Sequence, residues 1–406
     1  MKLRTLLCVG VSVFAFAKAY PQQPATSAAQ VQQGITQKRT AQQNSLVKNL
    51  PFENIGPSVM SGRVVDLAVN PDMPSEFYVG YASGGVWYTN NNGTTFEPIL
   101  DTSDTQNVGD IAVDWKSGTI WVGTGENNSS RSSYAGIGIL KSTDKGATWE
   151  NVGLTDSHHI GRILINPSNP DEVVIGVTGH LYSSNEERGV YKTTDGGKTW
   201  NKTLYVNSES GIIDVDHDPD NFNLMYASAW QRDRKAWHFE GSGSGSGMYK
   251  STDGGTTWEK LNGFPSGDGV GRIGIAVYDA NIVYAVHDSQ FRRKAEENGN
   301  NSSGALSKDD FKTMSKDAFL ALDNKRLNGF LKSNNFQEKY RAENVKGMVR
   351  NGSVQPVDLA KYLETANTQL FDTPVVGAEV YRSDDAGKTW KKTHEGYLDD
   401  IYSSYG

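Results

Sequence analysis

Short apolar stretches separated by turn-forming residues recur along most of this chain. In residues 62–100 four such stretches follow one another: GRVVDLAVNP, EFYVGYAS, GVWYTNN and TTFEPIL. Residues 161–206 repeat this order with GRILINP, DEVVIGVTG, RGVYKTT and KTWNKTLYV. Apolar or alternating runs of this length, bounded by Gly, Pro, Asn and Asp, are typical of antiparallel β-strands. Each unit is therefore predicted to be one four-stranded sheet.

An eight-residue motif, S/T-x-D/N-x-G-x-T-W/F, recurs at the last turn of these units. Glycine supplies the positive φ of a tight turn, and the Asp or Asn side chain folds back onto backbone amides of the same turn. The aromatic residue packs beneath the hairpin and removes roughly 150–250 Å² from water. We therefore predict a structural role for the motif. It occurs five times, at intervals of 53, 51, 58 and 132 residues, with its central residue at Asn91, Asp144, Asp195, Asp253 and Asp385.

A unit near 50 residues cannot bury its sheet face alone, so neighbouring units must stack, which indicates a β-propeller. The motif is that of the Asp-box, or BNR repeat, and the chain resembles the secreted bacterial BNR-repeat proteins of the sortilin/Vps10 propeller group. The resemblance extends from about Phe52 to Trp390 apart from one insertion. It implies an all-β propeller with five four-stranded Asp-box blades in this chain. Sialidases, xyloglucanases, sorting receptors and assembly factors share the motif, so it does not single out a function.

The domain organisation follows from composition. Residues 1–19 have two basic residues, an apolar core and an A-x-A end, which predicts a secretory signal peptide and a secreted, periplasmic or cell-surface protein. Residues 20–49, rich in Gln, Ala, Ser and Thr, are predicted to be a disordered leader. The propeller is predicted to occupy the remainder, 50–406, with blades near 60–100, 107–155, 160–206, 211–262 and 270–395.

A helical insertion is predicted within the fifth blade, at residues 290–372. Apolar residues there recur at helical spacing, for example Phe319, Leu327 and Phe330. The chain leaves the blade after its second strand and returns at GAEVYRS. Two interpretations remain open: a peripheral subdomain that covers one edge of the ring, and a lid or partner-docking element over one face.

An outer strand without a motif ahead of it stands near the N-terminus. FENIG at 52–56 matches WENVG at 149–153, the outer strand that follows an Asp-box. In a closed propeller such a strand completes the last blade, but the fifth unit already has its own outer strand. We therefore expect these 406 residues to be the N-terminal part of a longer propeller.

Charge and composition exclude several classes of function. A net charge of −7 without a basic run argues against nucleic-acid binding, and no apolar segment is long enough to span a membrane. The only cysteine, Cys8, lies in the predicted signal peptide, so the mature chain has no disulfide, cysteine nucleophile or Cys-ligated metal. Of seven histidines, His158 and His159 adjoin, but no metal-ligand spacing emerges. We predict neither a metal nor a cofactor.

The resemblance also identifies what a hydrolase of this group requires. Glycoside hydrolysis needs two opposed carboxyl groups. In the xyloglucanases one catalytic Asp lies two residues before a Gly-Gly pair, whereas Ala82 stands two residues before Gly84-Gly85 here, and the second carboxylate comes from another propeller. The R-I-P motif of sialidases does not occur. If the protein is a hydrolase, part of its acid/base pair lies beyond this chain, and the candidates within it are Asp110, Glu126 and Asp214.

Three arginines follow glycine at the start of inner strands, which line the channel of a propeller. They are Arg63, Arg162 and Arg272, and together they would form an anion-binding ring. The alternative is that they form structural salt bridges. The partners predicted for these bridges are Asp66, Asp110 and Asp214.

Two further segments have residues suited to ligands. The long loop at 229–247 contains Trp230, Arg232 and Trp237, and aromatic platforms beside guanidinium groups suit sugar or peptide recognition, although a loop packed on its neighbour is equally consistent. The alternate carboxylates of DVDHDPDN at 214–221 resemble a cation site, but a solvated turn is favoured because the Gly and the final Glu of a calcium loop are missing. The main prediction is a module that binds a protein or glycan partner on one face, and the alternative is a polysaccharide hydrolase.

Overall fold

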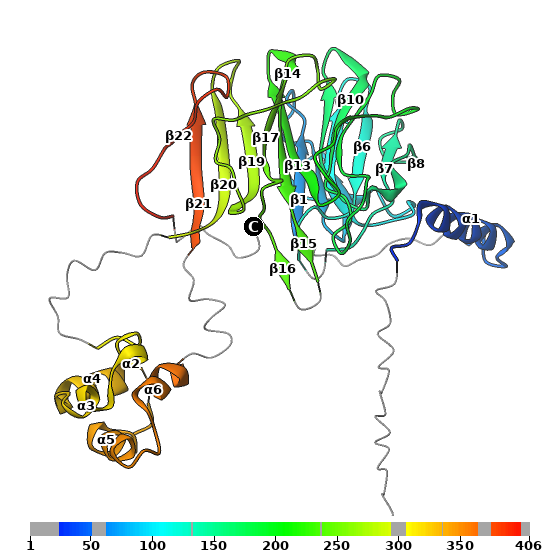
Figure 1. The fold of residues 1–406 in the computed structure, drawn as a ribbon. Coiled ribbons are helices and arrows are strands. Elements are labelled where there is room, and N and C mark those ends of the chain that lie inside the picture. Colours follow the sequence, from blue (N-terminus) through cyan, green and yellow to red (C-terminus); the bar gives the residue numbers. More distant parts are fainter. Residues whose placement is uncertain are drawn as a thin grey trace, which may run out of the picture. The chain divides into compact units, whose positions relative to one another are not determined.

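Each predicted unit is a four-stranded antiparallel sheet, and five such sheets follow one another along the chain (Figure 1). The structure is a computed structural model, and it describes residues 24–50, 62–130, 133–235, 238–293, 306–334, 336–363 and 375–398. These residues divide into two units, Met1–Val215 with Asp233–Glu240 and Asp216–Arg232 with Gly241–Gly406. The mostly-β class with propeller-type four-stranded sheets is confirmed.

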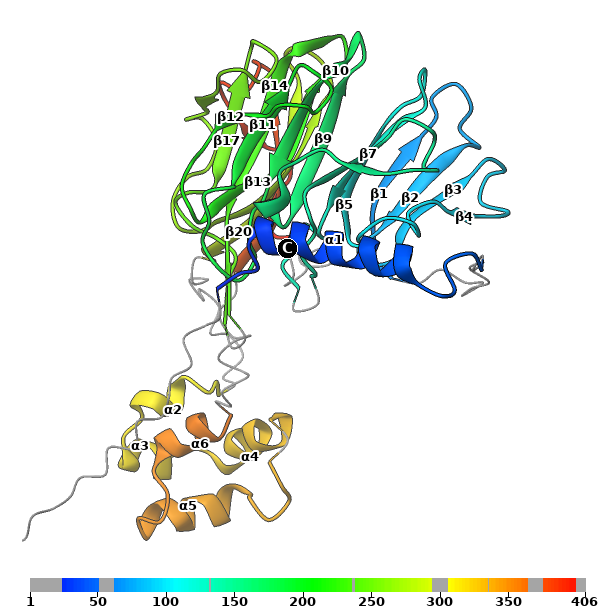
Figure 2. The same cartoon turned by 90° about the vertical axis from the view of Figure 1, so that its right-hand side faces the viewer.

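The first three sheets lie in the first unit, and in each of them the strands are neighbours in chain order (Figure 2). The first sheet consists of β1 (Val64–Val69), β2 (Phe77–Tyr81), β3 (Gly85–Thr89) and β4 (Glu97–Pro98). The second consists of β5 (Val108–Asp114), β6 (Thr119–Thr124), β7 (Ile139–Ser142) and β8 (Glu150–Asn151). The third consists of β9 (Ile160–Asn166), β10 (Asn169–Val177), β11 (Gly189–Thr193) and β12 (Asn201–Leu204).

The remaining two sheets have the same order, with one addition. The fourth consists of β13 (Ser210–Asp218), β14 (Asn221–Gln231), β17 (Gly247–Ser251) and β18 (Glu259–Lys260). A two-stranded ribbon, β15 (Asp233–Arg234) and β16 (Phe239–Glu240), is inserted between β14 and β17. The fifth consists of β19 (Val270–Val277), β20 (Val283–Arg292), β21 (Val375–Ser383) and β22 (Lys391–Lys392).

The Asp-box turns share one network of hydrogen bonds. In the third copy the Thr193 hydroxyl donates to Asp195 Oδ1 at 2.7 Å and accepts from the N–H of Gly197 at 3.0 Å. Asp195 Oδ1 accepts from the Thr199 N–H at 2.9 Å, and Oδ2 accepts from the Thr199 hydroxyl at 2.6 Å. The boxes around Asp144, Asp253 and Asp385 repeat these contacts. The network closes the turn between the third and fourth strands of each sheet.

In two of the boxes the final tryptophan donates a hydrogen bond to the preceding repeat, whereas Trp258 and Trp390 donate to a glycine carbonyl of their own box. The Trp149 indole N–H donates to the Ile99 carbonyl at 2.8 Å, and the Trp200 indole donates to the Val152 carbonyl at 2.8 Å. Both acceptors directly follow the outer strand of the previous sheet. Trp200 also packs edge-on against the fully buried Trp121. The box therefore stabilises both its own turn and the contact between successive repeats.

Among the described residues between β20 and β21 there are five helices, in the segment predicted to be a helical insertion (yellow to orange in Figure 1). They pack around their own apolar core, which includes Phe311, Phe319 and Leu327. Capping helps to start two of them, since Ser315 and Asp323 accept backbone N–H groups from the first turns of α3 and α4. The helices are α2 (Asp310–Thr313), α3 (Lys316–Leu320), α4 (Asn324–Ser333), α5 (Ala342–Arg350) and α6 (Pro356–Leu363).

The predicted disordered leader is wrong for one stretch, because α1 spans Ala28–Asn44. Ser27 and Gln30 form a capping box, and the Gln, Ala and Lys residues of this stretch are good helix formers even though none of them is buried. Lys38 and Arg39 pair with Asp104, at 3.2 and 3.0 Å, which fixes the helix to the first unit. The low apolar content of this stretch led to the prediction of disorder. The helix propensity of its residues and these ion pairs favour a helix instead.

Two further predictions concern segments outside the described residues. They are the signal peptide at 1–19 and the FENIG strand at 52–56. Among the helices that the structure does describe, none is both long and apolar enough to cross a lipid bilayer.

Candidate functional site

Carboxylates link the inner strands of successive repeats. Asp66 Oδ2, in β1, accepts the N–H of Ile111 in β5 at 3.1 Å. Asp110 Oδ2, in β5, accepts the N–H of Ile163 in β9 at 2.7 Å. In the second unit Asp216 makes the same kind of contact, to the N–H of Val277 at 2.7 Å. The side chain of one inner strand thus satisfies a backbone donor of the next strand.

Glycines at the start of the inner strands allow this close approach. A Cβ on Gly109 would lie 2.3 Å from the Ile160 carbonyl oxygen and 2.4 Å from that of Gly125. A Cβ on Gly161 would lie 2.5 Å from the Ile213 carbonyl oxygen. Each is far inside van der Waals contact and involves backbone, so neither glycine tolerates a side chain. The glycines before Asp110 and Arg162 are therefore a packing requirement, whereas a Cβ on Gly62, before Arg63, would meet no atom within 4 Å.

Arg162 lies among three of these inner-strand carboxylates. Its Nε donates to Asp214 Oδ1 at 3.0 Å, and Nη1 donates to Asp110 Oδ1 at 3.3 Å and lies 3.8 Å from Asp66 Oδ1. The exposed fraction of the side chains is 38% for Arg162, 18% for Asp66, 11% for Asp214 and 3% for Asp110. We call these four residues the Arg162 cluster. Its accessible atoms are a guanidinium and two carboxylates.

Burial raises the pKa of Asp110 well above its usual value, and the attraction of Arg162 opposes this shift while Asp66 adds to it. The attraction of Asp110 raises the pKa of Arg162, which stays charged. One guanidinium thus faces three carboxyl groups, and the cluster has no excess positive charge to offer an anion. Arg162 makes the salt bridges that were the alternative interpretation, and this does not favour the predicted anion-binding ring.

Arg63 has a different carboxylate partner. Its Nε and Nη2 atoms each lie 2.5 Å from an oxygen of Glu126, whose side chain is fully buried while Arg63 is 45% exposed. The hydrogen bond to Glu126 raises the pKa of Arg63. Of the three predicted catalytic carboxylates, Asp110 and Asp214 share Arg162, whereas Glu126 is fixed in this separate bidentate pair.

The predicted aromatic platform is not formed by Trp230. Its side chain is only 1% exposed, and its indole N–H donates to the Gly241 carbonyl at 2.7 Å. The Arg232 and Arg272 guanidinium carbons lie 5.3 and 5.8 Å from the ring centroid, and Arg232 is itself buried. This part of the loop packs inward, as the alternative interpretation had it. Trp237 lies outside the described residues.

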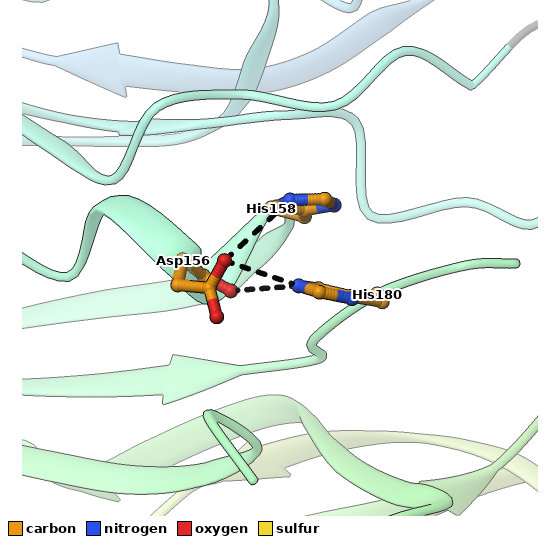
Figure 3. A group of neighbouring side chains, drawn as sticks. All are labelled: Asp156, His158 and His180. Carbon is orange, nitrogen blue, oxygen red and sulfur yellow. Dashed lines mark hydrogen bonds and ion pairs between the residues drawn. The ribbon is translucent and has the colours of Figure 1, made fainter. Parts of the chain in front are cut away.

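A second polar cluster was not predicted from the sequence: Asp156, His158 and His180 (Figure 3). Asp156 lies in the short helix η1 (Thr155–Ser157), His158 directly follows it, and His180 follows β10. Asp156 Oδ1 lies 3.6 Å from His180 Nε2 and 3.9 Å from His158 Nε2. The two imidazole rings stack at 3.6 Å between centroids, with 20° between their planes. We call these three residues the histidine cluster.

Both histidines of this cluster are held in the neutral form. Burial lowers the pKa of His158 to about 4, and the neighbouring His180 lowers it further. Burial also lowers the pKa of His180, against the attraction of Asp156. Neutral imidazole is the form that binds metal ions. His159, the next residue in the sequence after His158, is not part of this cluster. Its Nδ1 atom lies 2.7 Å from the Glu126 carbonyl oxygen.

Family comparisons agree with the repeat architecture. Residues 138–337 match the family described as "Sortilin, neurotensin receptor 3", and residues 381–392 match the BNR/Asp-box repeat. These parts of the chain are thus similar to sortilin-type and Asp-box repeats. The resemblance inferred from the motif is confirmed in this respect.

Two relatives are xyloglucanases. A probable oligoxyloglucan-reducing end-specific xyloglucanase of Neosartorya fischeri is 27% identical over 162 residues, which is 37% of this chain and 17% of the relative. Xyloglucanase Xgh74A of Acetivibrio thermocellus is 27% identical over 146 residues, 32% of this chain and 16% of the relative. The chain thus spans about a sixth of the length of these curated relatives. Their activity is a property of much longer proteins.

Two solved structures of similar proteins are GH74 enzymes. The GH74 xyloglucanase from Xanthomonas campestris has a TM-score of 0.46 and 16% identity, over 81% of this chain and 38% of that chain. The GH74 enzyme of Niastella koreensis has a TM-score of 0.45 and 18% identity, over the same shares.

Proposed function

We propose that this protein acts on a polysaccharide and that the Arg162 cluster is where its Asp-box repeats bind the glycan chain. The observation that carries the proposal is a set of partly exposed polar side chains on the inner strands β1, β9 and β13: the guanidinium of Arg162 and the carboxylates of Asp66 and Asp214. Sugar hydroxyls both donate and accept hydrogen bonds, so carboxylate acceptors beside a guanidinium donor suit them.

The charge of the cluster favours a neutral ligand. Three carboxyl groups surround one guanidinium, so an anionic polymer would meet repulsion, whereas a neutral glycan would not. Asp110 contributes by holding Arg162 and the next strand in place, since both of its oxygens accept hydrogen bonds. The two xyloglucanase relatives support a polysaccharide as the class of ligand. A protein partner remains a prediction from the sequence.

Hydrolysis of the bound glycan is the second candidate function. A carboxyl group with a raised pKa, Asp110, shares Arg162 with a second carboxylate, Asp214, and glycoside hydrolysis needs such a pair. Against catalysis by Asp110 stand its 3% exposure and its engaged oxygens. Ala82, in the place of the xyloglucanase Asp, is also buried and cannot act as an acid. Binding is therefore the primary proposal for this chain.

One experiment tests both candidates. The purified full-length protein is titrated with a panel of neutral polysaccharides that includes xyloglucan and other β-glucans, with an anionic polysaccharide as the contrast, and reducing ends are measured in the same samples. Saturable binding to a neutral glycan is the expected result. Release of reducing ends would establish the hydrolase. Failure to bind every neutral glycan, or preference for the anionic one, would overturn the proposal.

We also propose that the protein is exported, because a protein that binds such polysaccharides would find them outside the cytoplasm. It is supported by the basic start, apolar core and A-x-A end of residues 1–19. N-terminal sequencing of the mature protein from its native host tests it. A first residue of Tyr20 is expected, and a retained Met1 would contradict export by this route.

A further inference from the structure

We propose that the histidine cluster is a binding site for a divalent transition-metal ion of the Zn²⁺ type. Its three side chains supply two imidazole nitrogens and one carboxylate, a ligand set that Zn²⁺ prefers in proteins. One candidate ligand atom from each lies within 4.8 Å of the others. The three residues come from two separate turns, after β8 and after β10, so a shared ion would join them.

The spacing of the ligand atoms is close to that of a zinc site. With metal–ligand distances of about 2.0–2.2 Å and tetrahedral angles, two ligand atoms lie roughly 3.3–3.5 Å apart. Asp156 Oδ1 lies 3.6 Å from His180 Nε2 and 3.9 Å from His158 Nε2. Contraction by a few tenths of an ångström therefore brings the carboxylate and the His180 nitrogen to the separation of two ligands, whereas His158 must also turn.

The stacked rings require one rearrangement. The lone pair of an imidazole nitrogen lies in the plane of its ring, and two rings that stack with only 20° between their planes cannot both point at one ion. His158 is the ring that turns, because its side chain is 15% exposed and that of His180 is 8% exposed. Its backbone has φ of 56°, in the left-handed region, as does that of Leu154 at the other end of η1. The turn thus places the His158 ring over the face of the His180 ring.

The second nitrogen of His180 already has a partner that would orient the ring. Ser183 Oγ lies 2.9 Å from His180 Nδ1, and metal-bound histidines usually donate their other N–H to such an oxygen. His180 Nε2 lies 3.0 Å from the Asp156 carbonyl oxygen, a contact that the ion would replace. When the ion is bound to Nε2, the proton of the neutral His180 ring would lie on Nδ1, whose N–H would donate a hydrogen bond to the Ser183 hydroxyl oxygen.

The test is zinc binding by the chelator-treated, full-length protein, freed of any histidine tag. At neutral pH we expect one equivalent of Zn²⁺ per chain to remain after dialysis and the melting temperature to rise on its addition. Asp156→Asn, His158→Asn and His180→Ala should each weaken binding at least about tenfold, and Ser183→Ala by about 10–100-fold. Asn at position 158 tolerates the positive φ, which keeps that variant foldable.

His238→Ala is the matched control, because His238 is exposed and lies outside the cluster. It should bind zinc as the wild type does. Circular dichroism of every variant without metal checks that the fold is retained. The proposal is overturned if the wild type retains no stoichiometric zinc, or if folded Asp156→Asn and His180→Ala bind it as tightly as the wild type. A failed zinc titration leaves the glycan proposal untouched, since the two clusters share no residue.

Discussion

The carboxylate of Asp110 accepts the backbone N–H of Ile163 at 2.7 Å and so ties β5 to the inner strand of the next repeat. The same carboxylate accepts a hydrogen bond from Arg162, and Asp110 is almost completely buried. Asp66 repeats the contact one sheet earlier. A polar residue on an inner strand thus has two roles here, since it pairs strands across repeats and positions the guanidinium that would meet a ligand.

Replacement of Asp110 by Ala should destabilise the protein strongly. The change leaves the Ile163 N–H without its acceptor and removes one of the carboxylates that Arg162 contacts, and a buried polar group left unsatisfied costs about 1–3 kcal/mol. Denaturant unfolding measures the loss. Asp72→Ala is the control, because Asp72 is exposed, and it should stay within about 0.5 kcal/mol of the wild type. Equal stability of the two variants would refute the role given to Asp110.

Gly109→Ala should be equally damaging for a steric reason. The added methyl group would lie 2.3 Å from the Ile160 carbonyl oxygen, so the inner strands must move apart, at a cost of about 1–3 kcal/mol. Gly34→Ala is a matched control, since no atom lies within 4 Å of that position in α1. It should be neutral or stabilise the helix by about 1 kcal/mol. The melting temperatures of the two variants measure the difference.

The Asp-boxes predict how stability depends on acid. Hydrogen bonds from Thr148 and Ser142 lower the pKa of Asp144 to about 2, from an ordinary value of 3.8. Because the unfolded state binds more protons between these two values, the contribution of Asp144 is complete above pH 3.8 and is lost as the pH falls through about 2. Asp144→Asn cannot titrate, and Asn91 shows that the box accepts Asn.

Unfolding of the wild type and of Asp144→Asn is to be followed from pH 2 to pH 6. The variant should be less stable at pH 6, and the difference should shrink as the pH falls toward 2. A difference that does not depend on pH would mean that Asp144 is not held ionised by its box.

His158 predicts a second, separate pH effect in metal-free protein. Its pKa is about 4 in the folded protein and 6.5 ordinarily, so the unfolded state binds more protons between these values. The stability of the wild type should therefore fall as the pH drops from 6.5 to 4. His158→Asn should remove part of this slope, as measured by chemical denaturation with a chelator present. An unchanged slope would show that His158 is not buried as a neutral ring.

The sheets and the Asp-boxes are predictable from the sequence because their determinants are local. Every hydrogen bond of the Asp195 side chain is made within the box, between Thr193 and Thr199, so the turn is encoded where it forms. The determinants of the helix at Ala28–Asn44, including its capping box, are also local. The prediction of disorder rested on the low apolar content of this stretch. Composition alone was a poor guide there.

The sites depend on contacts between repeats, which the sequence does not display. Trp230 lies in a loop whose composition suggested an exposed aromatic platform. Its side chain is buried instead, and its indole N–H donates to the Gly241 carbonyl. His158 and His180 are 22 residues apart, and only the course of η1 and β10 brings their rings together. Arg63 reaches Glu126 across 63 residues. Spacing along the chain carries no information about such pairs.

The measurement that tests the central claim most directly is an equilibrium titration of the best-binding neutral polysaccharide with wild-type protein, Asp214→Asn and the control Asp72→Asn. Asp214 is a partly exposed carboxylate of the Arg162 cluster, and a lost hydrogen bond to a charged group weakens binding about tenfold or more. We expect that loss for Asp214→Asn alone, with circular dichroism showing that all three proteins are folded at the temperature of the titration. Equal affinity of Asp214→Asn and the wild type would contradict glycan binding at the Arg162 cluster.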